Sequence, residues 1–222
     1  MSCSAKIKEI FSSIQGEGIY IGVKQLFIRF CGCNLSCSYC DTDFDIQNSK
    51  AYTIDELTEI VKQNSDCHSV SLTGGEPLLN ADYLEEFLPK CTLPVYLETN
   101  ATLAEELDKI IDYVDYIAAD IKIPSCCGGI PHWIEHDKFF SIASQKILFA
   151  KIVFNSDITD DEIKKSTELA KKYNIELVLQ PMCNSDSIAI DTNTIESVFD
   201  KYLINYKKVR LIPQVHKMLN IR

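Results

Sequence analysis

The stretch Cys31-Gly-Cys-Asn-Leu-Ser-Cys-Ser-Tyr-Cys-Asp-Thr42 is the part of the sequence around which the rest of the chain is organised. It places Cys33, Cys37 and Cys40 four and three residues apart on a polar loop. Thiolates at this spacing can converge on one iron-sulfur cluster, and a 4Fe-4S cluster with only three cysteine ligands leaves one iron open. The stretch therefore predicts a 4Fe-4S site with chemistry at its open iron.

The alternative for these cysteines is a structural zinc site, with Cys31 or a distant thiol as the fourth ligand. Zinc sites of that kind usually combine two Cys-x-x-Cys pairs. This sequence has one such pair, and Cys126 and Cys127 are adjacent, a poor spacing for a second pair. The spacing favours the cluster.

Length and composition indicate one globular domain over residues 1–222. The formal net charge of -10 argues against a nucleic-acid partner, because phosphate binding requires clustered Lys and Arg. No signal peptide and no run approaching roughly 20 apolar residues is present, so we expect a cytoplasmic protein without a membrane partner. In such a protein the ten cysteines point to metal binding or catalysis.

Strands and helices are expected to alternate along most of the chain. The expected strands are residues 25–30, 69–73, 94–99, 116–119, 150–154, 176–180 and 209–212. The expected helices are residues 53–64, one capped by Asp82 and Glu85, and residues 103–111, 159–173 and 194–203. Within residues 6–24, the glycine-rich stretch 12–22 is expected to be a loop, and residues 41–52 and 120–145 are expected to lack a clear element. This order predicts an α/β fold with a mostly parallel sheet, closed or partly closed.

Polar residues lie at or just past the C-terminal ends of the expected strands, the rim where such folds build active sites. They are Arg29, the cysteine loop, Thr73 to Glu76, Glu98 to Asn100, Asp120 to Lys122 and Gln180. We expect these residues to gather in one site.

The Cys-x-x-x-Cys-x-x-Cys loop, followed by Thr73-Gly-Gly-Glu-Pro77 after the next strand, resembles the radical S-adenosylmethionine (SAM) superfamily. The resemblance implies a partial, trimmed TIM-like barrel with a radical SAM core. It also implies that the open iron binds SAM, and that one electron from the cluster breaks a carbon-sulfur bond to give a 5'-deoxyadenosyl radical. Tyr39 would then lie near the adenine, and Gly75 and Glu76 would face the methionine end of SAM.

Further motifs resemble one family of that superfamily, the 7-carboxy-7-deazaguanine synthases. They are Ser13-Ile-Gln-Gly-Glu-Gly18, Phe27-Ile-Arg-Phe30 and Pro213-Gln-Val-His-Lys217, and the similarity runs from end to end. It implies a homodimeric carbon-nitrogen lyase that converts 6-carboxy-5,6,7,8-tetrahydropterin to 7-carboxy-7-deazaguanine with loss of ammonia. The reaction belongs to the biosynthesis of queuosine, a tRNA modification, and related 7-deazapurines. A flavodoxin-type protein would supply the electron, and no side chain is expected to be a catalytic residue.

The family resemblance also implies roles for individual residues. Thr42 matches the position whose hydroxyl helps to bind Mg²⁺ against the substrate carboxylate. The implied substrate-binding residues are Ile14, Gln15, Gly16, Glu17, Arg29, Thr73 and Arg222. The implied SAM-binding residues are Tyr39, Cys40, Asp41, Gly75, Glu76, Asp120, Ile121, Lys122, Gln180, Pro181, Met182 and Cys183. The family often has Ser-Pro-Lys in place of Asp120-Ile-Lys122, and Pro in place of Arg222.

Other interpretations of the same residues stay open at this point. A glycyl-radical-enzyme activating protein uses the same cluster, although the Gln15-Gly-Glu-Gly18 loop and Asp41-Thr42 argue against it. A non-catalytic electron carrier would need a fourth protein ligand for its cluster and no cofactor pocket. For Arg29 the alternative role is an ion pair with an acidic neighbour, and for Thr42 a place in a turn. His216 by itself is more typical of a structural residue.

Overall fold

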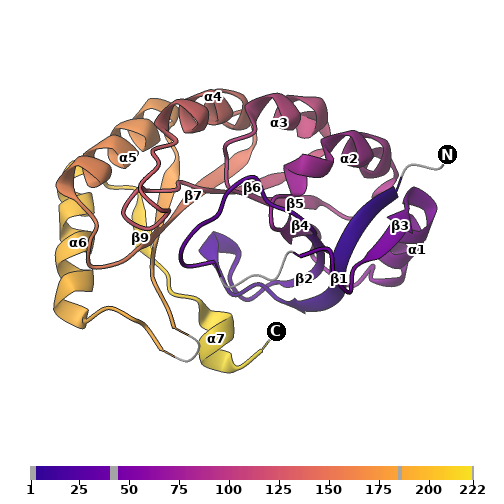
Figure 1. Ribbon diagram of the computed structural model, residues 1–222, viewed down its shortest axis with the longest axis horizontal. Helices are drawn as coiled ribbons and strands as arrows, with labels where there is room; N and C mark the ends of the chain where they lie inside the picture. Colours follow the sequence, from indigo (N-terminus) through magenta and orange to yellow (C-terminus); the bar gives the residue numbers. More distant parts are fainter. Residues whose placement is uncertain (1–3, 41–44, 185–186, 222) are drawn as a thin grey trace.

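A computed structural model describes residues 4–40, 45–184 and 187–221. In this part of the chain the strands form one nine-stranded sheet with the order β3-β1-β2-β4-β5-β6-β7-β8-β9 (Figure 1). The strands are β1 (Ser4–Ile14), β2 (Lys24–Phe30), β3 (Lys50–Thr53), β4 (Ser69–Gly74), β5 (Val95–Thr99), β6 (Tyr116–Asp120), β7 (Ile147–Phe154), β8 (Glu176–Pro181) and β9 (Val209–Leu211). Strand β1 pairs antiparallel with β2 and β3, and the neighbours from β2 to β9 pair in parallel. Strands β3 and β9 are the edges, so the described sheet is an open, partial TIM-like barrel.

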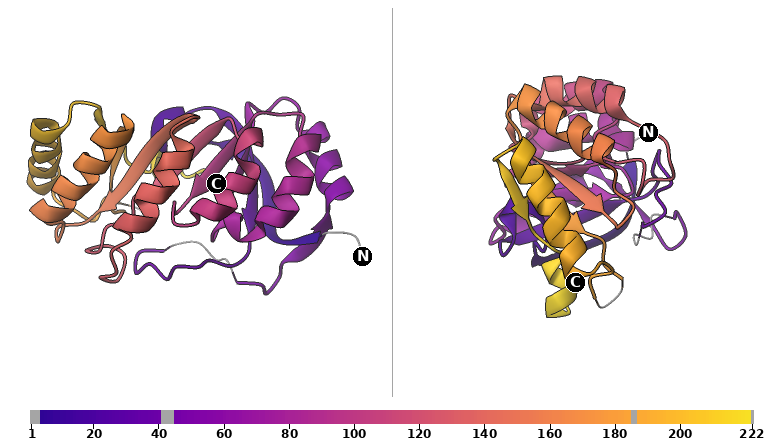
Figure 2. Two further views of the ribbon diagram at one scale, coloured as in Figure 1. Left: turned by 90° about the horizontal axis from the view of Figure 1, so that it is seen from above. Right: turned by 90° about the vertical axis from the view of Figure 1, so that its left-hand side faces the viewer.

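The helices form an arc along one side of this sheet, as Figure 1 shows for α2 to α6. The helices of this side are α1 (Ile54–Gln63), α2 (Ala81–Phe87), α3 (Ala104–Ile110), α4 (Trp133–Ala143), α5 (Asp160–Tyr173) and α6 (Thr192–Asn205). The short helix α7 (Val215–Leu219) lies apart from them in Figure 1, against the loop after β1. In the right-hand view of Figure 2 the magenta and orange helices lie above the strands. No helix among the described residues combines the length and the apolar character that a membrane span requires.

The two faces of the sheet differ because successive residues of a strand point to opposite sides. On the outer face, which the helices cover, side chains such as Ile28, Leu72 and Leu97 are fully buried in the main core. The opposite, inner face has a smaller apolar cluster, in which Tyr96 and Phe149 pack with residues of the short turn Gly18–Tyr20. One step further along the same strands, toward their C-terminal ends, the inner face becomes polar.

Most of the predicted elements are confirmed, with ends displaced by a few residues. The helices α1 and α5 begin with capping boxes made by Thr53 with Glu56 and by Thr159 with Glu162. In each, the threonine hydroxyl accepts from the glutamate N–H, and the glutamate carboxylate accepts from the threonine N–H. These reciprocal bonds satisfy N–H groups that the first turn of a helix would otherwise leave unpaired.

Several sequence-based expectations are wrong. The loop expected over residues 12–22 begins only after Ile14, because Ser4–Ile14 forms β1, which pairs with β2 and β3 through its backbone. Within 41–52, residues from Lys50 onward belong to the edge strand β3, and within 120–145 a helix, α4, begins at Trp133. Asp82 does not cap α2, which follows Asn80 without a side-chain cap.

Candidate active site

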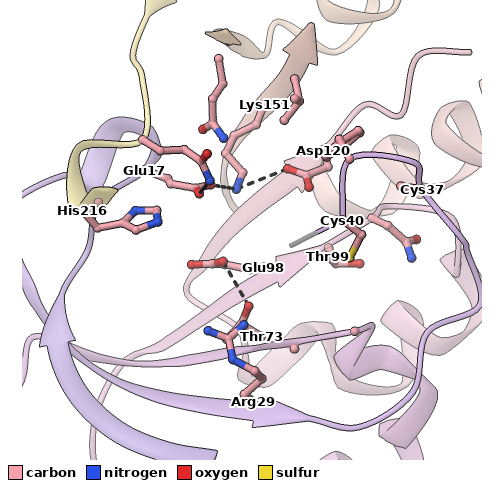
Figure 3. A pocket seen from close by; sticks show the side chains of 18 of the residues that line it. Glu17, Arg29, Cys37, Cys40, Thr73, Glu98, Thr99, Asp120, Lys151 and His216 are labelled. Carbon is pink, nitrogen blue, oxygen red and sulfur yellow. Dashed lines mark hydrogen bonds and ion pairs between the residues drawn. The ribbon is translucent and has the colours of Figure 1, made fainter. Parts of the chain in front are cut away.

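A cavity of about 260 Å³ opens on the inner face at the C-terminal ends of the parallel strands (Figure 3). It brings together most of the residues that the sequence singled out. The predicted site residues that line it are Ile14, Gln15, Gly16, Glu17, Arg29, Cys33, Cys37, Tyr39, Cys40, Thr73, Gly75, Asp120, Lys122, Gln180, Met182 and Cys183. Glu76, Ile121 and Pro181 are buried beside the cavity without lining it. Asp41, Thr42 and Arg222 lie outside the described residues.

The cysteine loop follows β2 directly and presents the thiols of Cys33, Cys37 and Cys40 to this cavity. A hydrogen bond from the Cys127 thiol lowers the pKa of Cys37 to about 6, against the effect of burial. Within the described residues no three His, Cys, Asp or Glu side chains form a group that could hold one metal ion. Cysteine thiolates are the usual ligands of 4Fe-4S clusters, so the donor set of this loop fits such a cluster.

The Gly74-Gly75-Glu76 turn at the end of β4 packs directly against the cysteine loop. A Cβ atom on Gly75 would lie 1.9 Å from the Gly32 carbonyl oxygen and 3.1 Å from Cys33 Cβ, so only glycine fits there. The N–H of Glu76 donates to the same Gly32 carbonyl at 2.8 Å. The turn and the thiol loop are therefore in direct backbone contact.

Glu76 itself joins β4 to the end of β5. Its carboxylate, fully buried, accepts from the Thr99 hydroxyl at 2.9 Å, from the Asn100 N–H at 2.8 Å and from the Leu78 N–H at 3.1 Å. Burial raises the pKa of this carboxyl to about 7. In this arrangement Glu76 positions the rim of the cavity and does not face its interior.

On the side of the cavity next to the cysteine loop, Lys122 connects β6 to that loop. Its Nζ donates to Asp120 Oδ2 and to the Tyr39 hydroxyl, each at 2.8 Å. The Lys122 N–H donates to His136 Nε2 at 3.0 Å, and His136 Nδ1 lies 3.0 Å from the Ala101 carbonyl oxygen. The helix α4, which the sequence did not predict, thus supports the loops after β5 and β6.

One buried acceptor in the wall of the cavity, Gln180 Oε1, has no hydrogen-bond partner among the described residues. A second, Asp120 Oδ1, accepts no hydrogen bond among them but lies 3.5 Å from the ammonium of Lys151. Buried polar atoms are rarely left without a partner, so Gln180 Oε1 is suited to a donor group of a bound ligand. The ammonium and hydroxyl groups of SAM are donors of this kind, and the residues present therefore fit SAM.

Glu98 lies on the side of the cavity away from the cysteine loop. Figure 3 shows its side chain between those of Glu17 and Thr73. Its carboxylate accepts from Gln15 Nε2 at 2.7 Å and from the Thr73 hydroxyl at 3.2 Å. The sequence placed Glu98 at a strand end but gave it no role. The signal was there, since it is the only charged residue of a strand otherwise made of Val95, Tyr96, Leu97 and Thr99.

The structure shows the ion pair that the sequence left as the alternative for Arg29, and it also places this side chain in the cavity wall. Its Nε donates to Glu9 Oε1 on the neighbouring strand β1 at 2.7 Å, and its guanidinium lies 5.9 Å from the centre of the Phe11 ring. The same side chain lines the cavity and points toward Thr73 in Figure 3. The ion pair therefore orients the guanidinium at the edge of the site.

The C-terminal segment closes the cavity over the loop after β1. Gln214 Nε2 donates to Glu17 Oε1 at 2.8 Å, and the Val215 N–H donates to the Gly16 carbonyl at 2.9 Å. A Cβ atom on Gly16 would lie 2.4 Å from His216 Nδ1, so a glycine is needed for this contact. Gln214, which the sequence did not single out as a site residue, is thus part of the cavity wall.

Lys151, in the middle of β7, was also missed. Its Nζ lies 2.6 Å from Glu17 Oε2 and 3.5 Å from Asp120 Oδ1 (Figure 3). Burial would raise the pKa of Glu17, but Lys151, with help from Gln214, lowers it to about 2. A lone lysine inside the apolar run Ile147–Phe154 was the available signal, of the same kind as Arg29 in β2.

Comparisons with known proteins agree with this geometry. The radical SAM superfamily matches residues 27–183. A 7-carboxy-7-deazaguanine synthase of Geobacter sulfurreducens is 38% identical over 246 residues, a match that covers 97% of this chain and 97% of that protein. The 7-carboxy-7-deazaguanine synthase of Archaeoglobus fulgidus is 38% identical over 236 residues, covering 98% of this chain and 99% of its own length. The crystal structure of QueE from Escherichia coli shares the fold, with a TM-score of 0.64 at 18% identity over 95% of this chain and 94% of that chain.

Proposed function

Because the chain belongs to the 7-carboxy-7-deazaguanine synthase family of the radical SAM superfamily, we propose that it converts 6-carboxy-5,6,7,8-tetrahydropterin to 7-carboxy-7-deazaguanine with loss of ammonia. The enzyme acts in 7-deazapurine biosynthesis, the route to queuosine. The observation that carries this proposal is one cavity with three thiols on one side and a carboxylate-lined pocket on the other. A radical enzyme needs both halves within reach of each other.

The half formed by the cysteine loop holds the cofactors. Cys33, Cys37 and Cys40 would hold the 4Fe-4S cluster, and the cluster with SAM would supply the chemistry of hydrogen-atom abstraction from C6 of the pterin. Gln180 offers a hydrogen-bond acceptor without a partner among the described residues, and Asp120 offers a carboxylate, for donor groups of SAM. The protein binds and orients these groups, while the cofactor supplies the reactive species.

The other half holds the pterin. Arg29, oriented by Glu9, offers a guanidinium for the substrate carboxylate. Glu17 is kept ionised and offers an acceptor for the N–H groups of the pterin ring. Gln15 and Thr73 both donate to Glu98, and these bonds fix the base of the pocket. The role of these side chains is to hold one face of the ring toward the cofactor half and to exclude water from it.

Magnesium is part of the proposal through Thr42, which follows the cysteine loop. An oxygen ligand suits Mg²⁺, and the ion would bind the substrate carboxylate beside the cluster. The Thr42→Ala variant is expected to turn over more slowly, with partial rescue by high Mg²⁺ and little change in 5'-deoxyadenosine release. Activity that depends on neither Mg²⁺ nor this substitution would remove the metal from the proposal.

The partners are proposed on the same basis. A reductant must deliver an electron to the cluster, and we assign this to a flavodoxin-type protein. We also propose a homodimer of one-domain subunits in the cytoplasm, where a reducing environment keeps the three cluster thiols free. Sedimentation of the reconstituted protein tests the dimer, and reduction by purified flavodoxin tests the donor.

The decisive experiment is anaerobic incubation of the reconstituted protein with SAM, a reductant and the carboxylated tetrahydropterin. We expect 7-carboxy-7-deazaguanine, ammonia and 5'-deoxyadenosine, identified by mass spectrometry. Cleavage of SAM without any conversion of the pterin would instead favour an activating enzyme for a protein substrate. A cluster that accepts electrons but does not bind SAM would indicate an electron carrier.

A further inference from the structure

Lys151 is the one buried lysine of the cavity wall for which the proposed reaction supplies no role, within the part of the chain that the structure describes. Its side chain is 7% exposed, and it stands on β7 between the apolar inner cluster and the open cavity. Burying an ammonium is costly unless carboxylates are placed to receive it. The position must therefore be understood from its partners.

These partners come from two separate segments of the chain. Glu17, on the loop after β1, approaches Lys151 Nζ to 2.6 Å, and Asp120, at the end of β6, approaches it to 3.5 Å. Asp120 also binds Lys122 at 2.8 Å, so two ammonium groups and two carboxylates balance in one buried network. Burial would lower the pKa of Lys151, but the carboxylates of Asp120, Glu17 and Glu98 raise it well above its usual value. These carboxylates therefore favour the ammonium form of Lys151.

Without Lys151 the loop after β1 has no cation from the sheet to hold it. Glu17 keeps one further side-chain bond, the 2.8 Å contact from Gln214 Nε2, which comes from the C-terminal segment and not from a strand. The carboxylate that faces the pterin pocket is therefore tied to the rigid sheet through a single ammonium.

We propose that Lys151 is a positioning residue of the pterin pocket, acting through Glu17: it fixes the carboxylate of Glu17 over the sheet and does not itself contact the pterin. This inference rests on the proposed function, because it takes the carboxylated pterin as the ligand. It predicts that replacing Lys151 weakens pterin binding only while Glu17 carries its charge. SAM binding should change much less, because Asp120 is also held by Lys122 and does not rely on Lys151 alone.

A double-mutant cycle on the reconstituted holoenzyme tests the proposal. Lys151→Met, Glu17→Gln and the double variant are compared for the dissociation constant of oxidised 6-carboxypterin, followed by its fluorescence, and for that of SAM. We expect Lys151→Met to raise the pterin constant by about tenfold or more, because it breaks a buried ion pair. In the Glu17→Gln background the same substitution should change it by less than about threefold. The thermal midpoint of the cluster-free protein should show the same coupling.

Lys109→Met is the matched control. Lys109 also binds two carboxylates, Asp82 at 2.8 Å and Glu106 at 2.9 Å, but on the exposed surface of α3 and away from the cavity. It should leave pterin binding unchanged.

An equal loss of pterin binding in both backgrounds, or no loss in either, would overturn the proposal. If Lys151→Met fails to fold, the test rests on comparing Glu17→Gln with the double variant, in which removing both charges keeps the charge balance. Weaker pterin binding in the double variant than in Glu17→Gln would then count against the inference. If the wild-type enzyme makes no deazaguanine, the proposed function fails on its own. The coupling in thermal midpoint remains measurable in that case, so the two failures are distinguishable.

Discussion

Leu97 and Glu98 are neighbours in β5 and lie on opposite faces of the sheet. Leu97 is fully buried in the main core under the helices, whereas Glu98 lies in the middle of the cavity. The same division holds for Ile28 and Arg29 in β2. Alternate residues of one strand thus serve stability and chemistry separately. Substitutions on the inner face should therefore change function with little loss of stability, and substitutions on the outer face should do the reverse.

The largest effect is expected at the cysteine loop. Cys33→Ala should abolish cluster binding and all formation of 5'-deoxyadenosine, because an iron loses its only protein ligand. The apoprotein should still unfold cooperatively. Iron content and visible absorption measure the cluster, and Cys31→Ala, at a cysteine that does not line the cavity, is the control. A cluster retained in Cys33→Ala and lost in Cys31→Ala would reverse the assignment.

On the outer face, Leu97→Ala should lower the free energy of unfolding by about 3 kcal/mol, since it leaves a void in a fully packed core. Its partner on the inner face, Glu98→Gln, keeps the shape and should cost less than about 1 kcal/mol. The Michaelis constant for the pterin should respond in the opposite order. Urea unfolding and steady-state kinetics on both variants measure these effects. A larger loss of stability in Glu98→Gln than in Leu97→Ala would contradict the division between the two faces.

Acid should act on the two faces in different pH windows. Burial on the outer face lowers the pKa of His136 from 6.5 to about 4. The folded state therefore favours neutral His136, and the stability of the fold is unaffected by this residue's titration above pH 6.5 but decreases as the pH drops toward 4. On the inner side, the pKa of Glu17 is lowered from 4.5 to about 2, so the contribution of its carboxylate to the stability of the fold is lost only below pH 4.5. Each amounts to about 3 kcal/mol in full. Unfolding free energies across pH should lose the upper slope in His136→Gln and the lower slope in Glu17→Gln.

The smallest effect in this series is expected for Arg29→Lys. A point charge does not reproduce the planar fork of a guanidinium, so pterin binding should weaken by about 2 kcal/mol. Stability should barely change, because the lysine can still pair with the half-buried Glu9. Unchanged pterin affinity in Arg29→Lys would show that Arg29 only serves its ion pair with Glu9.

The sequence predicted the parallel core and most of the cavity because both depend on local patterns. Strand, helix and glycine turn repeat in order, and the polar residue that ends each strand necessarily reaches the same rim. Strand β1 was missed because the glycines at 16, 18 and 22 dominated the interpretation of its neighbourhood. Its pairing with β2 and β3 is a property of the folded chain.

The ionic network was missed for a different reason. Lys151 and Glu17 are 134 residues apart, and no local spacing relates them. Glu76 shows the converse case, in which a motif was recognised but its side chain turned toward Thr99 and Asn100. A motif identifies residues that matter, but only the packing shows whether they face a ligand or hold another segment.

The bond between Gln214 and Glu17 spans 197 residues, almost the whole chain, and this has a consequence for the order of folding. Closing so long a loop costs entropy that is recovered only after the intervening strands are in place. The cysteine loop is held by the bond between Glu76 and Gly32, which closes a much shorter loop. In refolding, the cysteine loop is therefore expected to form before the bond between Gln214 and Glu17 closes the other side of the cavity.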